Sequence, residues 1–276
     1  MAANFLHPKH LLSELQKKPN KLLGQSFLHD SRALERVVQA ANLSKKDAVL
    51  EIGPGLGSLT RLLAERAGKV IAVEKDPDLA SILQKELGSR RNLEIMQGDI
   101  LKTKLSLPQK YKVVANIPYY ITSPVMRLFL EREERPELLV LMVQKEVAQR
   151  IIAKPPDMNL LAVSVQIYGV PEIVSYVSKA CFWPQPKVDS AILRIAPKDA
   201  GADFNAKQFF TVVRAGFKQP RRQVGNNLAA GLKKTKKEIK AWLQTKGISY
   251  ANRPETLSLQ DWLRLSSTVS QLPASL

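Results

Sequence analysis

The sequence has very little of what disulfide, metal or membrane chemistry requires. Among 276 residues there is one cysteine, Cys181, so neither an internal disulfide nor a cysteine-rich metal site can form. The three histidines, His7, His10 and His29, lack the spacing of metal ligands, so we interpret them as surface residues and expect no metal. The longest apolar run, residues 138–143, is far too short to cross a bilayer, and no secretory signal is recognisable. We therefore expect a cytoplasmic protein with no membrane partner.

Acidic residues are also scarce relative to basic ones. The chain has 42 Lys and Arg against 25 Asp and Glu, a formal net charge of +17. Such an excess favours a polyanionic partner. An anionic membrane surface is the alternative, but neither end of the chain offers a long basic amphipathic helix. The composition therefore favours a nucleic acid.

Short apolar segments alternate with helical ones over most of the chain. Strands are expected at residues 48–52, 70–73, 93–96, 112–115 and 138–143, and helices at 31–41, 58–67, 77–87 and 123–131. This alternation is typical of βαβ units around a parallel sheet. Two later strand candidates, 173–177 and 191–195, would close the sheet as a hairpin. The pattern predicts an α/β fold.

The composition changes after the last of these strands. Residues 199–202 have the character of a linker. Residues 207–264 carry 13 Lys and Arg against 3 Asp and Glu, in a pattern of short helices. We expect a flexible N-terminal segment (1–20), an α/β domain (21–198) and a small basic helical domain (203–276).

A glycine-rich turn follows the first strand and opens a helix. Gly53, Gly55 and Gly57 allow a tight turn and let a ligand approach the backbone. The G-x-G-x-G spacing differs from the dinucleotide fingerprint, and Pro54 removes an N–H that a pyrophosphate would need. Because no Gly-Lys-Ser/Thr follows, the turn does not indicate a nucleotide triphosphatase either. By itself it is also compatible with a simple strand–helix connection.

Carboxylates stand at the ends of the next two strands. Glu74 is placed to accept hydrogen bonds from the ribose hydroxyls of a nucleoside. The alternative is that Glu74, with Lys75 and Asp76, forms a solvated surface run. Asp99 follows the third strand and is placed to reach the amino group of an adenine ring. Open α/β sheets bind ligands outside such strand ends, so we expect a nucleoside-containing cofactor there.

The segment Asn116-Ile117-Pro118-Tyr119 follows the fourth strand and fits the methylation of an adenine amino group. The exocyclic nitrogen of adenine is a poor nucleophile, and two fixed oxygens that accept its N–H bonds improve it. Asn116 supplies a side-chain carbonyl and the Ile117-Pro118 segment a main-chain one. Pro118 stiffens the turn, and Tyr119 offers a face for a flipped-out base. A strand-terminating turn with a core tyrosine is the alternative.

An aromatic, proline-stiffened loop, residues 182–190, precedes the last strand. Phe182 is placed to close the other face of the target base. The alternative is a hydrophobic loop packed on the edge of the sheet.

Taken in order, these motifs resemble those of the rRNA adenine N6,N6-dimethyltransferases, the family of the kasugamycin-sensitivity methyltransferase. The resemblance runs from about residue 22 to residue 265. It implies a Rossmann-like S-adenosylmethionine-dependent methyltransferase sheet with a small all-helical C-terminal domain. It also implies which residues contact the donor S-adenosyl-L-methionine: Ser26, Leu28, Gly53, Gly55, Glu74, Asp99 and Asn116. The family commonly has Asn or His at the position of Ser26.

The resemblance implies a reaction and a partner. Members dimethylate two adjacent adenines near the 3′ end of small-subunit (16S) rRNA, so we expect a monomer acting on the assembling 30S particle. The related erythromycin-resistance methyltransferases, which modify one adenine of 23S rRNA, are the alternative. The C-terminal residues look like the small-subunit enzymes, and Lys218, Arg221 and Arg222 form a basic patch suited to RNA phosphates. A solvated helix surface is the other explanation of that patch.

Two further classes of function remain open at this point. A ribosome-assembly factor would use the same scaffold only to bind RNA, but it would not need the motifs at residues 53–57 and 116–119. A DNA adenine methyltransferase shares the chemistry of the Asn-Ile-Pro-Tyr segment, but the chain has no recognisable DNA target-recognition domain.

Overall fold

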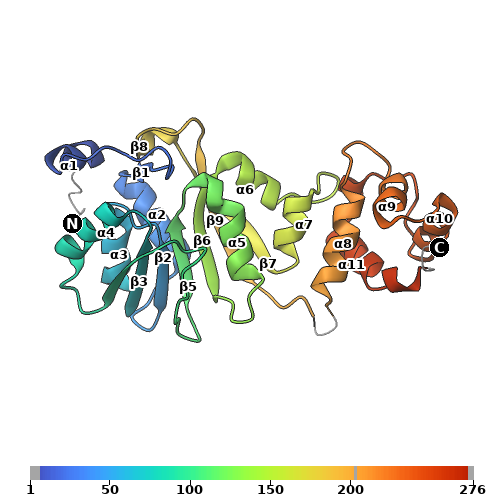
Figure 1. Cartoon of the computed structure of the whole chain (residues 1–276), viewed down its shortest axis with the longest axis horizontal. Coiled ribbons are helices and arrows are strands. Elements are labelled where there is room, and N and C mark those ends of the chain that lie inside the picture. Colours follow the sequence, from blue (N-terminus) through green and yellow to red (C-terminus); the bar gives the residue numbers. More distant parts are fainter. Residues whose placement is uncertain (1–6, 202–203, 273–276) are drawn as a thin grey trace. The chain divides into compact units, whose positions relative to one another are not determined.

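The computed structural model describes residues 7–201 and 204–272, which fall into two compact units (Figure 1). The first unit extends to Ala148 and includes Val170–Pro197; the second comprises Gln149–Gly169 and the chain from Lys198 onward. The expected domain limits differ from this division, since they gave residues 149–169 to the α/β domain. These residues associate with the helical unit because, for example, Met158 donates its backbone N–H to Glu255 at 3.0 Å.

The first unit is built on a seven-stranded sheet with the order β4-β3-β2-β5-β6-β9-β7. Its strands are β2 (Ala48–Ile52), β3 (Lys69–Glu74), β4 (Leu93–Gln97), β5 (Lys112–Asn116), β6 (Leu138–Gln144), β7 (Gly169–Val177) and β9 (Ser190–Pro197). Neighbours from β4 to β6 pair in parallel, and β9 pairs antiparallel to β6. The α/β prediction is confirmed, and the two late strands do join the sheet.

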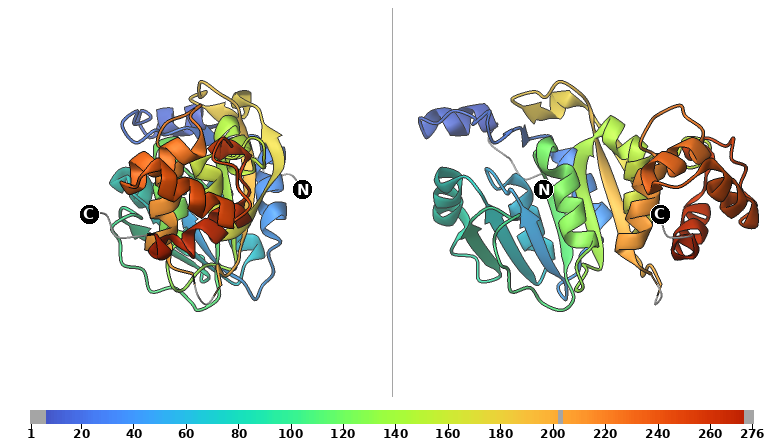
Figure 2. Two further views of the ribbon diagram at one scale, coloured as in Figure 1. Left: turned by 90° about the vertical axis from the view of Figure 1, so that its right-hand side faces the viewer. Right: turned by 45° about the vertical axis from the view of Figure 1, so that its right-hand side comes forward.

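Helices cover both faces of this sheet. They are α2 (Ser31–Ala41), α3 (Ser58–Arg66), α4 (Pro77–Leu87), α5 (Thr122–Leu130) and α6 (Lys145–Ile151). Helix α2 begins where Asp30 accepts the Ala33 N–H, and its apolar stripe packs with α3 against the sheet. Helix α5 lies on the face opposite α2 (Figure 1 and Figure 2). Burial on both faces explains why a strand such as β6 reads as a continuous apolar run.

The N-terminal segment is more ordered than its polar composition suggests. We expected residues 1–20 to be flexible; residues 1–6 lie outside the described residues, but Pro8–Glu14 form helix α1. Leu12 of α1 is buried with Phe27, Leu56 and Leu79, and this apolar contact anchors the helix. Next to it, the two-residue strands β1 (Phe27–Leu28) and β8 (Phe182–Trp183) pair antiparallel, which the sequence pattern did not reveal.

The second unit is helical throughout its described part. It contains α7 (Leu160–Gln166), α8 (Ala206–Gly216), α9 (Val224–Leu232), α10 (Lys236–Thr245) and α11 (Leu259–Ser266), with the short 3-10 turns η3 (Pro254–Thr256) and η4 (Val269–Gln271). Helices α8 and α11 meet at Trp262, which is fully buried; a Cβ on Gly216 would come within 2.3 Å of its ring. A glycine at this position therefore permits the close approach of the two helices. The expected helical C-terminal region is confirmed.

Within the described residues, none of the helices has the length and hydrophobicity needed to cross a membrane.

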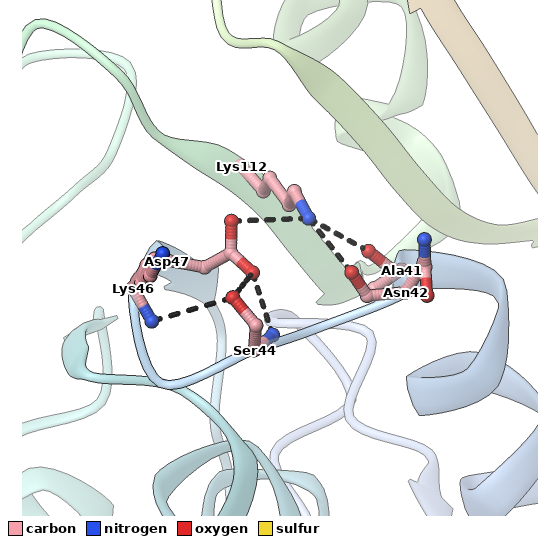
Figure 3. A network of polar contacts seen from close by, with 6 residues as sticks. All are labelled: Ala41, Asn42, Ser44, Lys46, Asp47 and Lys112. Atoms are coloured by element: carbon pink, nitrogen blue, oxygen red, sulfur yellow. Dashed lines mark hydrogen bonds and ion pairs between the residues drawn. The ribbon is translucent and has the colours of Figure 1, made fainter.

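A partly buried ion pair stabilises the edge of the sheet where β2 and β5 begin (Figure 3). Asp47 forms an ion pair with Lys112, with 3.1 Å between the carboxylate oxygen and the ammonium nitrogen, and both side chains are about 15% exposed. Lys112 also donates to the carbonyls of Ala41 and Asn42, at 3.3 and 2.8 Å. Burial by itself would raise the pKa of Asp47, but hydrogen bonds from Ser44 and Lys112 outweigh it and hold that pKa below its ordinary value.

We predict that Lys112→Met lowers the free energy of unfolding by about 2–3 kcal/mol, because it leaves the Asp47 carboxylate partly buried without its cation. Lys69→Met is the matched control: Lys69 also begins a strand, but its ion pair with Glu94 is half-exposed, so we expect a loss of about 1 kcal/mol or less. Since the folded pKa of Asp47 is depressed, its contribution is present above pH about 4 and is lost as the pH falls through the folded pKa. Equal losses for the two variants in urea unfolding would contradict this account.

Candidate active site

The carboxyl ends of the parallel strands meet at one edge of the sheet, where a crevice opens. The chain leaves β2 toward β3 on one side and later returns to place β5 on the other, so the strand order reverses between β2 and β5. The crevice holds about 1130 Å³ of space, part of it open to solvent. Every catalytic and cofactor-binding candidate from the sequence lines it: Ser26, Leu28, Gly53, Gly55, Glu74, Asp99, Asn116, Pro118, Tyr119 and Phe182.

The glycine turn after β2 leaves room for a ligand at one position. All three glycines have positive φ, between 59° and 80°. A Cβ on Gly57 would come within 2.6 Å of Leu83, and one on Gly55 within 3.1 Å of Phe27. Close packing against these side chains therefore explains why glycine stands at both positions. A Cβ on Gly53 would meet nothing within 4 Å. That open space beside a crevice-lining backbone fits a ligand held against the turn.

Glu74 is buried, which removes the alternative of a solvated surface run. Its side chain lines the crevice, and the residue is 6% exposed. One carboxylate oxygen accepts the Gly55 N–H at 2.9 Å and the other accepts the Asp76 N–H at 2.8 Å. Burial raises the pKa of Glu74. A carboxylate has about four lone-pair sites, so this one keeps acceptor capacity for a ribose hydroxyl.

Asp99 is held as a carboxylate by a partner that the sequence analysis had treated as surface. Lys75 forms an ion pair with Asp99 at 3.0 Å and also lines the crevice. The hydrogen bond from Lys75 is the main cause that holds the pKa of Asp99 below its ordinary value. An ionised Asp99 can accept a hydrogen bond from an adenine amino group, as expected. The lysine was not predicted, because its pairing depends on the register between β3 and β4.

The amide of Asn116 is oriented by a residue 90 positions away. Its nitrogen donates to the backbone carbonyl of Ser26 at 3.3 Å. This bond assigns the nitrogen end of the amide to the protein and leaves the oxygen Oδ1 as the acceptor. The Ser26 hydroxyl donates to the Pro184 carbonyl at 2.7 Å. Ser26 thus links the aromatic loop to the segment Asn116–Tyr119, the candidate reaction centre, through both its side chain and its backbone.

The two aromatic residues of the reaction centre are held by protein contacts. The Tyr119 hydroxyl shares a 2.7 Å hydrogen bond with the Ser190 hydroxyl, and burial raises the pKa of Tyr119. Phe182 pairs with Leu28 between β8 and β1 and is only 3% exposed, so its ring forms a wall of the crevice. The fixed hydroxyl restricts how the Tyr119 ring can tilt, which suits a stacking surface.

Glu51, in the strand that precedes the glycine turn, is a crevice-lining carboxyl to which the sequence analysis gave no role. It is 1% exposed, and its Oε2 atom has no hydrogen-bond partner among the described residues. Burial raises its pKa to about 8, with a smaller contribution from the nearby Glu74 charge. Glu51 is therefore mainly protonated at neutral pH. An unpaired buried polar atom in a crevice-lining residue is a second feature that fits a polar ligand.

The basic patch lies on a loop of the helical unit, not on a helix surface. Lys218, Arg221 and Arg222 are exposed in the connection between α8 and α9. The buried Asn227 side chain donates to the carbonyls of Gly216 and Gln219, at 2.7 and 3.0 Å, and so fixes the start of this loop. The described residues contain no group of three or more His, Cys, Asp or Glu that could hold a metal ion.

Comparison with known proteins agrees with the resemblance found in the sequence. The family model described as "Ribosomal RNA adenine dimethylase" matches residues 16–271. The chain belongs to this family.

Individual dimethylases and related enzymes match over most of their length. A ribosomal RNA small subunit methyltransferase A from Dehalococcoides mccartyi is 44% identical over 271 residues, covering 96% of this chain and 93% of that protein. The crystal structure of a dimethyladenosine transferase from Plasmodium falciparum matches with a TM-score of 0.78 and 28% identity, over 89% of this chain and 98% of that one. The crystal structure of the 23S rRNA methyltransferase ErmE matches with a TM-score of 0.72 and 30% identity, and the match covers 89% of this chain and 100% of that one.

We predict that Glu51→Gln changes how the stability of the dimethylase depends on pH. Because the folded pKa is raised from 4.5 to about 8, the wild-type protein loses stability as the pH rises through this interval. Relative to Glu51→Gln, the wild type should lose about 2 kcal/mol of unfolding free energy between pH of about 5.5 and about 7.5. Denaturant unfolding at the two pH values measures the difference, with the exposed Glu133→Gln as control. A wild type and a Gln variant with parallel pH profiles would show that the Glu51 carboxyl is not protonated in the fold.

Proposed function

We propose that the chain uses S-adenosyl-L-methionine to dimethylate the N6 amino groups of two adjacent adenines near the 3′ end of small-subunit (16S) rRNA. The observation that carries this proposal is the fixed amide of Asn116 in a crevice that also contains Gly53, Glu74 and Asp99. The space beside Gly53 and the polar groups around it fit a nucleoside-containing methyl donor. Its sulfonium supplies an activated methyl group, so the protein does not have to provide an acid or a metal.

The residues of the reaction centre have separate roles in this proposal. Glu74 binds the ribose of the donor, Asp99 the amino group of its adenine ring, and Ser26, Leu28, Gly53 and Gly55 surround it. At the target adenine, Asn116 Oδ1 accepts one N–H bond. The Pro118 carbonyl already accepts the Ile121 N–H at 3.1 Å, in the 3-10 turn η1 (Tyr119–Ile121), so we assign the second acceptor to the Ile117 carbonyl.

These acceptors direct the nitrogen lone pair without removing a proton first. Neither an amide nor a peptide carbonyl is a base, so the proton of the methylated amine leaves to solvent. After the first transfer one N–H bond remains, and a single acceptor is then enough to orient the nitrogen for the second. Tyr119 and Phe182 enclose the base, and Pro118 keeps the turn rigid.

The choice of ribosomal subunit rests on the relatives. The matching protein at 44% identity is named as a small-subunit enzyme, whereas the large-subunit enzyme ErmE, the alternative, matches at 30%. The net charge of +17 and the exposed loop with Lys218, Arg221 and Arg222 suit an RNA partner. We further propose that the protein acts as a monomer in the cytoplasm, on the assembling 30S particle.

Purified protein, tritiated S-adenosylmethionine and ribosomal subunits that lack the modification test the proposal. We expect label in small-subunit rRNA only, with two methyl groups on each of two adjacent adenines. Nuclease digestion and mass spectrometry give the position and the number of methyl groups. Label confined to a single adenine of 23S rRNA would replace this function with that of the resistance enzymes. RNA binding without any label would leave an assembly factor instead.

We also predict that Asn116→Ala lowers kcat by about 10²- to 10³-fold, because the target amine loses one of its two fixed acceptors. Donor affinity, measured by calorimetry, should change by less than about fivefold, since most donor contacts remain. Gln97→Ala is the matched control, because Gln97 is an exposed amide at the end of the edge strand β4 and is not among the residues that line the crevice. Near-normal turnover of Asn116→Ala would exclude the proposed role.

A further inference from the structure

Two exposed tyrosines are found among the described residues, and both lie at the carboxyl edge of the sheet. Tyr120 is 56% exposed and follows the reaction centre. Tyr176 is 49% exposed and stands one residue before the end of the edge strand β7. The exposure of Tyr120 is explained by its place at the crevice, next to Tyr119. Tyr176, in contrast, belongs to no motif and has no role in the proposed chemistry.

A short series of contacts connects Tyr176 to the reaction centre. Tyr119 bonds Ser190, the first residue of β9, at 2.7 Å. The preceding residue, Asp189, accepts the backbone N–H of Lys145 at 3.0 Å. The ammonium group of Lys145 in turn lies 5.2 Å from the centre of the Tyr176 ring. Tyr176 is therefore at the same edge as Tyr119, separated from it by the ends of β6 and β9.

Lysines occur on the segments next to Tyr176 in the chain as well as over its ring. Lys179 and Lys187 are exposed on the loop that follows β7, and the Lys179 backbone N–H donates to the Asp189 carboxylate at 3.0 Å. An aromatic ring with an ammonium group over one face suits single-stranded RNA, because a base can stack on the exposed part of the ring while a phosphate meets the cation. The half-exposed ring and its neighbouring lysine thus match one class of ligand in both shape and charge.

The sheet order explains why RNA would pass over this point. In the proposed function, the donor contacts the ends of β2, β3 and β4, on one side of Asn116. The rest of the RNA chain must then leave the crevice on the other side, over the ends of β6, β9 and β7. Strands lie about 4.8 Å apart, so β7 is about 14 Å from β5, within reach of nucleotides next to the target.

We propose that Tyr176 and Lys145 form a docking site for the single-stranded rRNA that flanks the target adenine. Tyr176 stacks on a flanking base, and Lys145 binds the adjacent phosphate while it holds the ring in place. This proposal rests on the proposed function for the identity of the RNA. It concerns positioning and affinity, and the chemical step itself is left to Asn116 and its neighbours.

The test compares Tyr176→Ala with Tyr176→Phe, and with Val174→Ala as a control on the same exposed face of β7, where Val174 is 43% exposed. Fluorescence anisotropy with a labelled small-subunit rRNA fragment that contains the target gives the Kd, and methylation of small subunits gives KM and kcat. We expect Tyr176→Ala to raise Kd and KM by about 5- to 20-fold, as for the loss of one stacked base. Tyr176→Phe and Val174→Ala should stay within about twofold, and kcat and donor affinity should not change.

Lys145→Met tests the phosphate contact, with Lys145→Arg as the conservative variant. The Met variant should bind RNA more weakly and lower the slope of log Kd against log salt concentration by about 0.7, whereas Arg retains the slope. Wild-type RNA affinity for Tyr176→Ala, an equal loss for Tyr176→Phe, or an unchanged salt slope for Lys145→Met would each overturn the proposal. In each of these outcomes the wild-type protein still methylates small-subunit rRNA. If the proposed function itself failed, the wild-type protein would not label small-subunit rRNA at all.

Discussion

The structure depends on one constraint: parallel strands place all their carboxyl ends at the same edge of a sheet. Strands β2, β3, β4 and β5 are joined through helices or loops, and the central strands β2, β5 and β6 are buried on both faces, so these strands present polar groups to a ligand mainly at their ends. The reversal of strand order between β2 and β5 opens the crevice at that edge. The glycine turn, two carboxylates and the Asn116 amide meet there although they are spread over more than 60 residues of chain. The partly buried Asp47–Lys112 pair stabilises the opposite edge, where β2 and β5 begin.

Within the crevice, hydrogen bonds from the protein decide what each polar group can offer. Glu74 uses part of its carboxylate to hold the glycine turn, so its position and that of the turn are coupled. Asp99 is held ionised by Lys75. Asn116 donates its side-chain nitrogen to the Ser26 carbonyl, which leaves its oxygen available as an acceptor. A carbonyl in this fixed orientation costs little reorganisation when an amine approaches, so it can assist methyl transfer by accepting an N–H bond.

Most of the sheet and of the crevice could be predicted from the sequence, because both depend on short segments whose pattern is visible in neighbouring residues. Gly53, Glu74, Asp99 and Asn116 each follow directly from a strand with a strong apolar pattern, so assigning the strand also places the residue. What was missed depends on distant parts of the chain: the bond from Asn116 to Ser26, the pair of Lys75 with Asp99, and the two-residue strands β1 and β8. Helix α1 was missed because one buried leucine, Leu12, anchors a polar segment. Helices α6 and α7 have seven residues each, too short to show a clear helical period.

A crystal structure of the protein with S-adenosylhomocysteine and adenosine is the most direct test of the central claim, that one crevice holds donor and target on either side of Asn116. The account predicts the ribose of the donor on the Glu74 carboxylate and the amino nitrogen of adenosine within hydrogen-bond distance of Asn116 Oδ1 and the Ile117 carbonyl. An adenosine bound elsewhere, or an Asn116 amide that turns its nitrogen toward the adenine, would contradict it.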